Sequence, residues 1–132
     1  MKRKRKIVND LEFIGIDNFS GGKRLPISQV VVAGDFLYTW GHGVVFDPKN
    51  PEPGIRKEFE HLRELLAEKG LTFQHVVKTT VLLSRGEFFW IYTKIYQEYF
   101  KKPYPARTTI PCASDTVFLE IDLVAYKKGL SD

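Results

Sequence analysis

The sequence is poor in the residues that form disulfides and metal sites. It has one cysteine, Cys112, among 132 residues, so no disulfide can form within the chain. Its three histidines, His42, His61 and His75, lack the H-E-x-x-H and C-x-x-C contexts of metal sites. We therefore expect no metal site, and we expect Cys112 to be a small core residue in a reducing compartment.

Long apolar segments are absent as well. No stretch approaches the roughly 18 apolar residues that a membrane span requires, and none follows the basic N-terminus as in a secretory signal. The chain also lacks internal repeats and low-complexity linkers. We expect one cytoplasmic domain over residues 9–132, preceded by a disordered basic tail over residues 1–8.

The excess of positive charge is confined to that tail. The formal net charge is +4, from 20 basic and 16 acidic residues. Five of the basic residues are consecutive, Lys2 to Lys6, so residues 7–132 carry a net charge of −1. The run is either a solvated extension or an arm that binds phosphate. Because the body has neither a basic face nor an aromatic stacking platform, the composition argues against nucleic acid as a partner.

Hydrophobic periodicity predicts six strands and two helices. Gly34-Asp35 supplies a two-residue hairpin turn, and Gly70 ends a helix whose apolar stripe contains Ile55, Phe59 and Leu62. The strand over 75–83 has the continuous apolar run of a strand buried on both faces. We predict an α+β fold with two helices on one face of a mixed sheet. The strands span residues 12–16, 28–33, 36–40, 75–83, 106–112 and 117–126, and the helices 55–66 and 87–100.

The last predicted strand has two unlike faces. Its even positions include the carboxylates Glu120 and Asp122 beside apolar residues, which is typical of an interface or a cleft. Its odd positions are apolar throughout: Val117, Leu119, Ile121, Leu123 and Ala125.

Arg107 is the strongest candidate for binding an anion. It lies at the start of an otherwise apolar strand, so its guanidinium needs an anion, a carbonyl group or solvent. The rigid fork of donors matches a carboxylate. The alternative is a structural salt bridge to Glu120 or Asp122 on the neighbouring strand.

Several short stretches, taken in order, resemble the RidA/YjgF family of reactive-intermediate deaminases. The resemblance runs from about Pro26 to Tyr126. The stretches are Pro26-Ile27-Ser28-Gln29, the hairpin ending in Trp40-Gly41, Val76 to Val81, Tyr96 to Phe100, Pro105-Ala106-Arg107-Thr108-Thr109, and Leu119-Glu120-Ile121-Asp122.

This resemblance implies a chorismate-mutase-like subunit that forms a homotrimer with ligand clefts between neighbouring subunits. It implies hydrolysis of enamine or imine intermediates, of the 2-aminoacrylate or 2-iminobutanoate type, to 2-oxo acids and ammonia without a cofactor. Arg107 matches the arginine that grips the substrate carboxylate, and Glu120 matches the glutamate that positions the attacking water. Further substrate contacts are expected at Trp40, Gly41, Thr93, Thr108 and Thr109.

Four positions depart from the family pattern. Ile27 replaces a tyrosine, Trp40 a serine and Thr93 an asparagine, while Thr109 stands where many members have cysteine. These changes leave two functions open: a deaminase with an altered substrate range, or a trimeric module that binds 2-oxo acids, related metabolites or a partner without turnover. An RNA-binding or RNA-cleaving role that used the basic tail ranks last.

Overall fold

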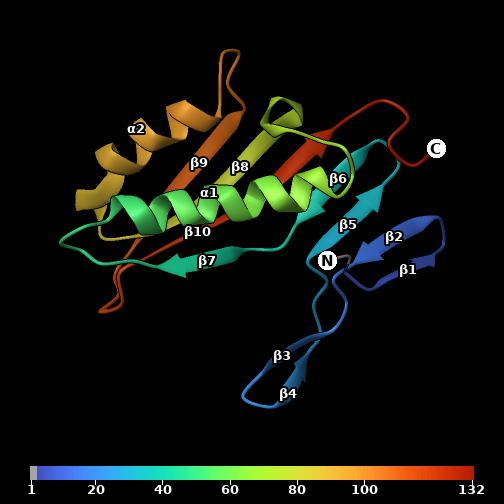
Figure 1. Cartoon of the computed structure of the whole chain (residues 1–132), viewed down its shortest axis with the longest axis horizontal. Helices are drawn as coiled ribbons and strands as arrows, with labels where there is room; N and C mark the ends of the chain where they lie inside the picture. The colour runs from blue at the N-terminus through green and yellow to red at the C-terminus, as the bar shows by residue number, and fades with distance from the viewer. Residues whose placement is uncertain (1–2) are drawn as a thin grey trace.

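The fold is a mixed sheet that carries its helices on one face, as predicted. A computed structural model describes residues 3–132. Helices α1 (Glu52–Ala67) and α2 (Phe89–Tyr99) lie side by side in front of the sheet (Figure 1). The strands are β1 (Arg5–Val8), β2 (Leu11–Ile14), β3 (Asn18–Ser20), β4 (Lys23–Leu25), β5 (Val30–Ala33), β6 (Phe36–Thr39), β7 (His42–Val45), β8 (Val76–Ser84), β9 (Ala106–Cys112) and β10 (Phe118–Tyr126).

The sheet is built around its last strand. Its order is β1-β2-β5-β6-β10-β8-β9, and β7 pairs with β10 next to β6. Strands β8 and β9 are parallel, while the other neighbours are antiparallel. The hairpin of β3 and β4 projects from the body (Figure 1). Strand β10 therefore holds the middle of the sheet, and β9 forms one edge.

Both helices follow from local sequence. The apolar stripe of α1 is buried, and Gly70 adopts a left-handed φ of +71° just after the helix, which glycine tolerates without strain. Helix α2 begins at Phe89 after a 3₁₀ turn over Gly86–Phe88, so the α-helix is shorter than the predicted 87–100.

The strand predictions are correct at the centre of the sheet, but they omit β1, β3, β4 and β7 and are wrong about the burial of β8. The hairpin of β5 and β6 turns at Gly34, with φ of +59°, and pairs Ala33 with Phe36. Strand β8 is not buried on both faces in the single chain. Val81 is buried under the helices, whereas Val77 is 44% exposed. One face of the sheet is therefore uncovered.

That uncovered face is rich in apolar side chains. Register places these residues on the same side as the even positions of β10, away from the helices. Each is more than a third exposed, and exposed apolar groups gathered on one face are typical of an interface. They are Phe36, Tyr38, Val45, Ile110 and Tyr126.

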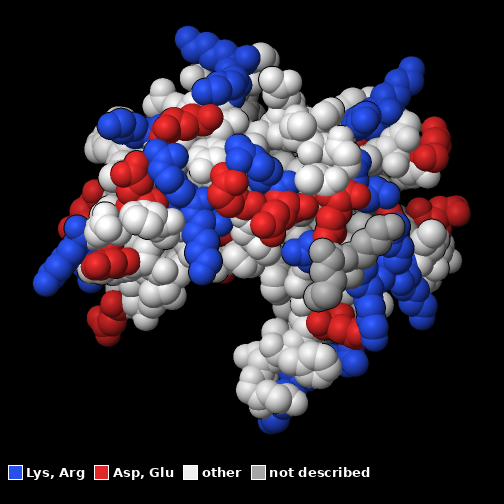
Figure 2. Space-filling model, in the orientation of Figure 1, with Lys and Arg blue, Asp and Glu red and all other residues white. Residues whose placement is uncertain are grey.

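The basic N-terminus is more ordered than predicted. Residues Arg5–Val8 form β1 against β2, so the expectation of a disordered tail is wrong for that part, while Met1 and Lys2 lie outside the described residues. Carboxylates accompany the basic side chains: Lys4 lies 2.8 Å from Asp17, Arg5 lies 3.0 Å from Glu12, and Arg3 pairs with Glu68. On the face seen in Figure 2, basic and acidic side chains are interspersed.

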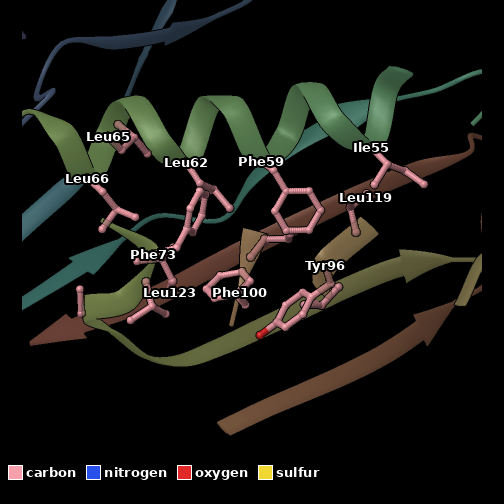
Figure 3. Packing of buried hydrophobic residues seen from close by; sticks show 14 of the residues in the cluster. Ile55, Phe59, Leu62, Leu65, Leu66, Phe73, Tyr96, Phe100, Leu119 and Leu123 are labelled. Carbon is pink, nitrogen blue, oxygen red and sulfur yellow. The ribbon is translucent and has the colours of Figure 1, made fainter. Parts of the chain in front are cut away.

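Phe59 is at the centre of the core between the two helices (Figure 3). Its ring is fully buried and stacks on the rings of Tyr99 and Tyr92, with centroids 4.7 and 6.2 Å away. Leu119 and Leu123 of β10 close the core from the sheet side. The packing of α2 on the sheet therefore depends on an aromatic side chain of α1.

We expect Phe59→Ala to lower the free energy of unfolding by about 3–5 kcal/mol, because it leaves a cavity among rigid rings. Denaturant titration measures the loss. Phe19→Ala is the control, since Phe19 is 58% exposed on the projecting hairpin and its change should stay within about 0.5 kcal/mol. Equal losses for the two variants would contradict the assignment of Phe59 to the centre of the core.

Candidate functional site

Arg107 lines a hollow at the edge of the sheet. It lies on β9, opposite the buried Thr79 of β8, so its side chain points to the helix-bearing face. The guanidinium lies 4.8 Å from the ring centre of Tyr96 and donates a hydrogen bond of 3.3 Å to the Thr93 hydroxyl. The adjoining hollow has a volume of about 280 Å³ and is lined by Thr93, Tyr96, Gln97, Tyr104, Pro105 and Arg107.

The guanidinium has no carboxylate partner among residues 3–132. The structural salt bridge to Glu120 or Asp122 is therefore not formed in the single chain. An unpaired arginine that is packed on aromatic rings and open to a hollow keeps its bidentate donors free for an anion.

Glu120 lies on the other face of the sheet. Its neighbours on β10, Leu119 and Ile121, are fully buried under the helices, so its own side chain points to the uncovered face. The carboxylate rests against a glycine: a Cβ atom on Gly41 would come within 2.7 Å of Glu120 Oε2. Any other residue at position 41 would displace the carboxylate, so Gly41 is needed for this close approach.

The two charged candidates are thus divided between the faces of one sheet. Arg107 lies on the helix-bearing face of the edge strand β9, and Glu120 on the uncovered face of β10. Strand alternation fixes this arrangement, because a side chain cannot change faces without a shift of register. Within one chain the two groups cannot meet at one ligand.

The other predicted site residues separate in the same way. Thr93 joins Arg107, and Gly41 joins Glu120. Thr108 points away from Arg107, and its hydroxyl accepts a 2.7 Å hydrogen bond from Lys78. The ring of Trp40 lies 5.8 Å from that of His42 and packs against the core, away from the hollow beside Arg107.

Two buried hydroxyls lie near Arg107. Thr109, two residues along β9, shares its face, and Tyr92 of α2 has its ring centre 5.3 Å from the guanidinium. Neither hydroxyl has a hydrogen-bond partner within residues 3–132, and burial raises the pKa of Tyr92. Tyr92 was not predicted as a site residue, since its position in an aromatic helical stripe indicates only core packing.

A second polar cluster lies beneath α1. Glu58 is fully buried, and its Oε1 accepts a 2.6 Å hydrogen bond from Nδ1 of His42, whose ring stacks on His61 at 3.5 Å. Burial raises the pKa of Glu58 to about 6 despite the opposing effect of His42. Burial, then the charges of His42 and Arg3, lowers the pKa of His61 to about 4.

Across residues 3–132, no group of three or more His, Cys, Asp or Glu side chains is arranged to hold a metal ion. The same residues contain no helix with the length and apolar character needed to cross a membrane.

Several known proteins are similar to this chain in sequence or in fold. The model of the family described as Endoribonuclease L-PSP matches residues 22–127. A RutC family protein of Pyrococcus horikoshii is 31% identical over 112 residues, covering 78% of this chain and 88% of that relative. Human 2-iminobutanoate/2-iminopropanoate deaminase is 33% identical over 115 residues, covering 80% and 83%. The crystal structure of E. coli TdcF with bound serine has the same fold, with a TM-score of 0.69 at 23% identity, covering 80% and 91%.

The helices on one face and the strand order define a chorismate-mutase-like α+β subunit. The chain belongs to the RidA/YjgF family, whose sequence model carries the Endoribonuclease L-PSP description.

The raised pKa of Glu58 predicts a pH-dependent stability. The folded state binds the proton more tightly than the unfolded state, where the pKa is 4.5. This contribution is present in full below pH 4.5 and is lost as pH rises through about 6. Denaturation of wild type and Glu58→Gln should therefore show wild type gaining about 2 kcal/mol relative to the variant between pH 8 and pH 4.

Glu64→Gln is the matched control, because Glu64 is exposed on the same helix. Its stability difference from wild type should stay flat over that pH range. A flat difference for Glu58→Gln would show that the buried carboxyl titrates normally.

Proposed function

We propose that the protein hydrolyses small imines and enamines that carry a carboxylate, releasing a 2-oxo acid and ammonia. The observation that carries this proposal is the unpaired Arg107 at the mouth of a hollow. A guanidinium in that setting binds a carboxylate through two parallel hydrogen bonds, which orients the rest of a small ligand.

The reaction needs one water molecule and one base. The ligand binds as the iminium, the protonated imine or enamine, with its carboxylate on Arg107. Glu120 takes a proton as the water oxygen forms its bond to the iminium carbon, which gives a carbinolamine. Proton transfer to nitrogen and cleavage of the C–N bond then leave the ketone and ammonia. No electron is gained or lost, so the chemistry needs no redox cofactor.

The proposed site contains two copies of the chain. Since Arg107 and Glu120 lie on opposite faces of the sheet, Arg107 of one subunit and Glu120 of the next form each cleft. The exposed apolar residues of the uncovered face, such as Tyr38 and Ile110, support association there. The edge position of β9 leaves Arg107 near the border of such an interface. We propose a homotrimer with three equivalent clefts.

The relatives support this class of ligand. Human 2-iminobutanoate/2-iminopropanoate deaminase is named for its imine substrates, and TdcF was crystallised with serine, a small amino acid with a carboxylate. Trp40 packs away from the Arg107 hollow, so this bulky replacement leaves the hollow open. Thr93 keeps a hydroxyl beside the guanidinium where the family has an asparagine.

The test is turnover of 2-aminoacrylate or 2-iminobutanoate, generated by a dehydratase and followed as the 2-oxo acid. We expect Arg107→Ala to lower kcat/KM about 100-fold, through loss of two charge-assisted hydrogen bonds. Glu120→Gln should lower kcat by about 10²- to 10⁴-fold with little change in KM. Arg63→Ala, an exposed arginine on α1, is the matched control and should be unaffected.

Two outcomes would contradict the proposal. If wild type accelerates neither reaction yet binds 2-oxo acids in a calorimetric titration, the protein is a binding module without turnover. If Arg107→Ala is as active as wild type, the hollow is not the substrate site.

A further inference from the structure

Glu58 occupies a place where a carboxylate is costly. It lies within the apolar stripe of α1, between Ile55 and Leu62, and is fully buried. Replacing a buried charged pair by apolar side chains of similar volume is often neutral or stabilising. One of its oxygens, Oε2, has no hydrogen-bond partner within residues 3–132. Core packing alone therefore does not account for this residue.

The contacts of Glu58 reach β10 at the residue that follows Glu120. Its Oε1 is 2.6 Å from Nδ1 of His42, which pairs with Ile121 on β10. The backbone amide of Ile121, the residue after Glu120, lies beside the same carboxylate. Glu58 thus ties β7 to β10 from the helix side, at the level where Glu120 emerges on the other side.

The glycines on either side of His42 form the support of the Glu120 side chain. The Cβ position of Gly41 is 2.7 Å from Glu120 Oε2, and that of Gly43 is 3.5 Å from Glu120 Cβ. A side chain at either position would enter the space that Glu120 occupies, and Gly43 pairs with Glu120 in the sheet, so any movement of His42 shifts the backbone beside which Glu120 lies. A bond that fixes the His42 ring therefore also fixes the Glu120 carboxylate.

We propose that Glu58 and His42 form a buried pair that positions Glu120 through the backbone of Gly41 and Gly43. This inference rests on the proposed function in assigning Glu120 to the water, and it adds two residues that touch neither substrate nor water. They are positioning residues, which act from the opposite side of the sheet.

Four ionisable groups surround the pair and set its charge. On the helix side, His61 of α1 stacks on His42, and Arg3 faces His61 from the N-terminus. Glu68 pairs with Arg3. Glu120 faces Glu58 across the sheet. With the pKa of Glu58 raised to about 6, the carboxylate holds His42 above that pH and loses its charge below it. The Glu58–His42 pair should therefore hold Glu120 less firmly below pH 6.

Two substitutions separate positioning from folding. Glu58→Leu suits the apolar stripe but leaves His42 without its partner, so its thermal stability is measured beside its kcat. Glu58→Gln keeps the shape and one acceptor oxygen. We expect kcat to fall about tenfold or more in both variants while KM stays within about twofold, because Arg107 binds the carboxylate elsewhere. The acid limb of kcat near pH 6 should disappear in both.

Glu64→Gln is the control and should keep the wild-type kcat and pH profile. A kcat within about twofold of wild type in both Glu58 variants would overturn the proposal. The proposal would also be overturned if kcat fell in the Glu58 variants only in proportion to their lost stability, while the acid limb of kcat stayed unchanged.

A readout independent of turnover keeps this test apart from that of the proposed function. In NMR spectra, Glu58→Gln should shift the backbone amides of Gly41 and Gly43 and the side-chain carboxyl carbon of Glu120, whereas Glu64→Gln should not. Absent shifts overturn the positioning role even in an active enzyme. Clear shifts in a protein that turns over no imine uphold the coupling to Glu120, while the proposed hydrolysis fails.

Discussion

The alternation of side chains across the sheet is the constraint on which the site depends. Residues two apart on a strand share a face, and register carries that face from β10 through β8 to β9. The core uses one face, where Leu119, Ile121 and Leu123 meet the helices. Glu120 therefore belongs to the other face, and Arg107 to the same face as the core. A site that uses both must draw them from different chains.

The two faces are linked through the strands themselves. Glycines at 41 and 43 remove the side chains that would separate β7 from Glu120, so the backbone passes directly between the buried Glu58–His42 pair and the outer carboxylate. The stacked rings around Phe59 hold α1, which carries Glu58, at a fixed height above the sheet. The position of Glu120 therefore depends on the packing of the core around Phe59.

Much of this fold is predictable from local sequence. Strand β10 is readable because its odd positions are apolar without exception, and α1 because its apolar residues recur every three or four positions. Gly34 marks the hairpin because few other residues adopt its φ. Strand β7 was missed because Gly41 and Gly43 on either side of His42 hide its β character, and β1 because its pairing with β2 lies in a basic run.

The site is only partly predictable for a different reason. Arg107 and Glu120 are identified by residue type and by family motifs. The face of the sheet on which Arg107 lies, however, depends on how β9 pairs with β8, and the paired residues are 28 positions apart in the chain. The sequence therefore left open a salt bridge between them that the register forbids. Glu58 lies beside Phe59 on the buried stripe of α1, so it could have been predicted from the helical pattern as a carboxylate at an apolar position.

Mixed oligomers test the central claim, that each site takes Arg107 from one chain and Glu120 from another. Arg107→Ala and Glu120→Gln chains would be co-expressed with different affinity tags and purified on both tags in turn. A three-membered ring that contains both kinds has one cleft with both residues intact, so about one third of wild-type activity should return. Activity no greater than that of either variant alone would contradict the account.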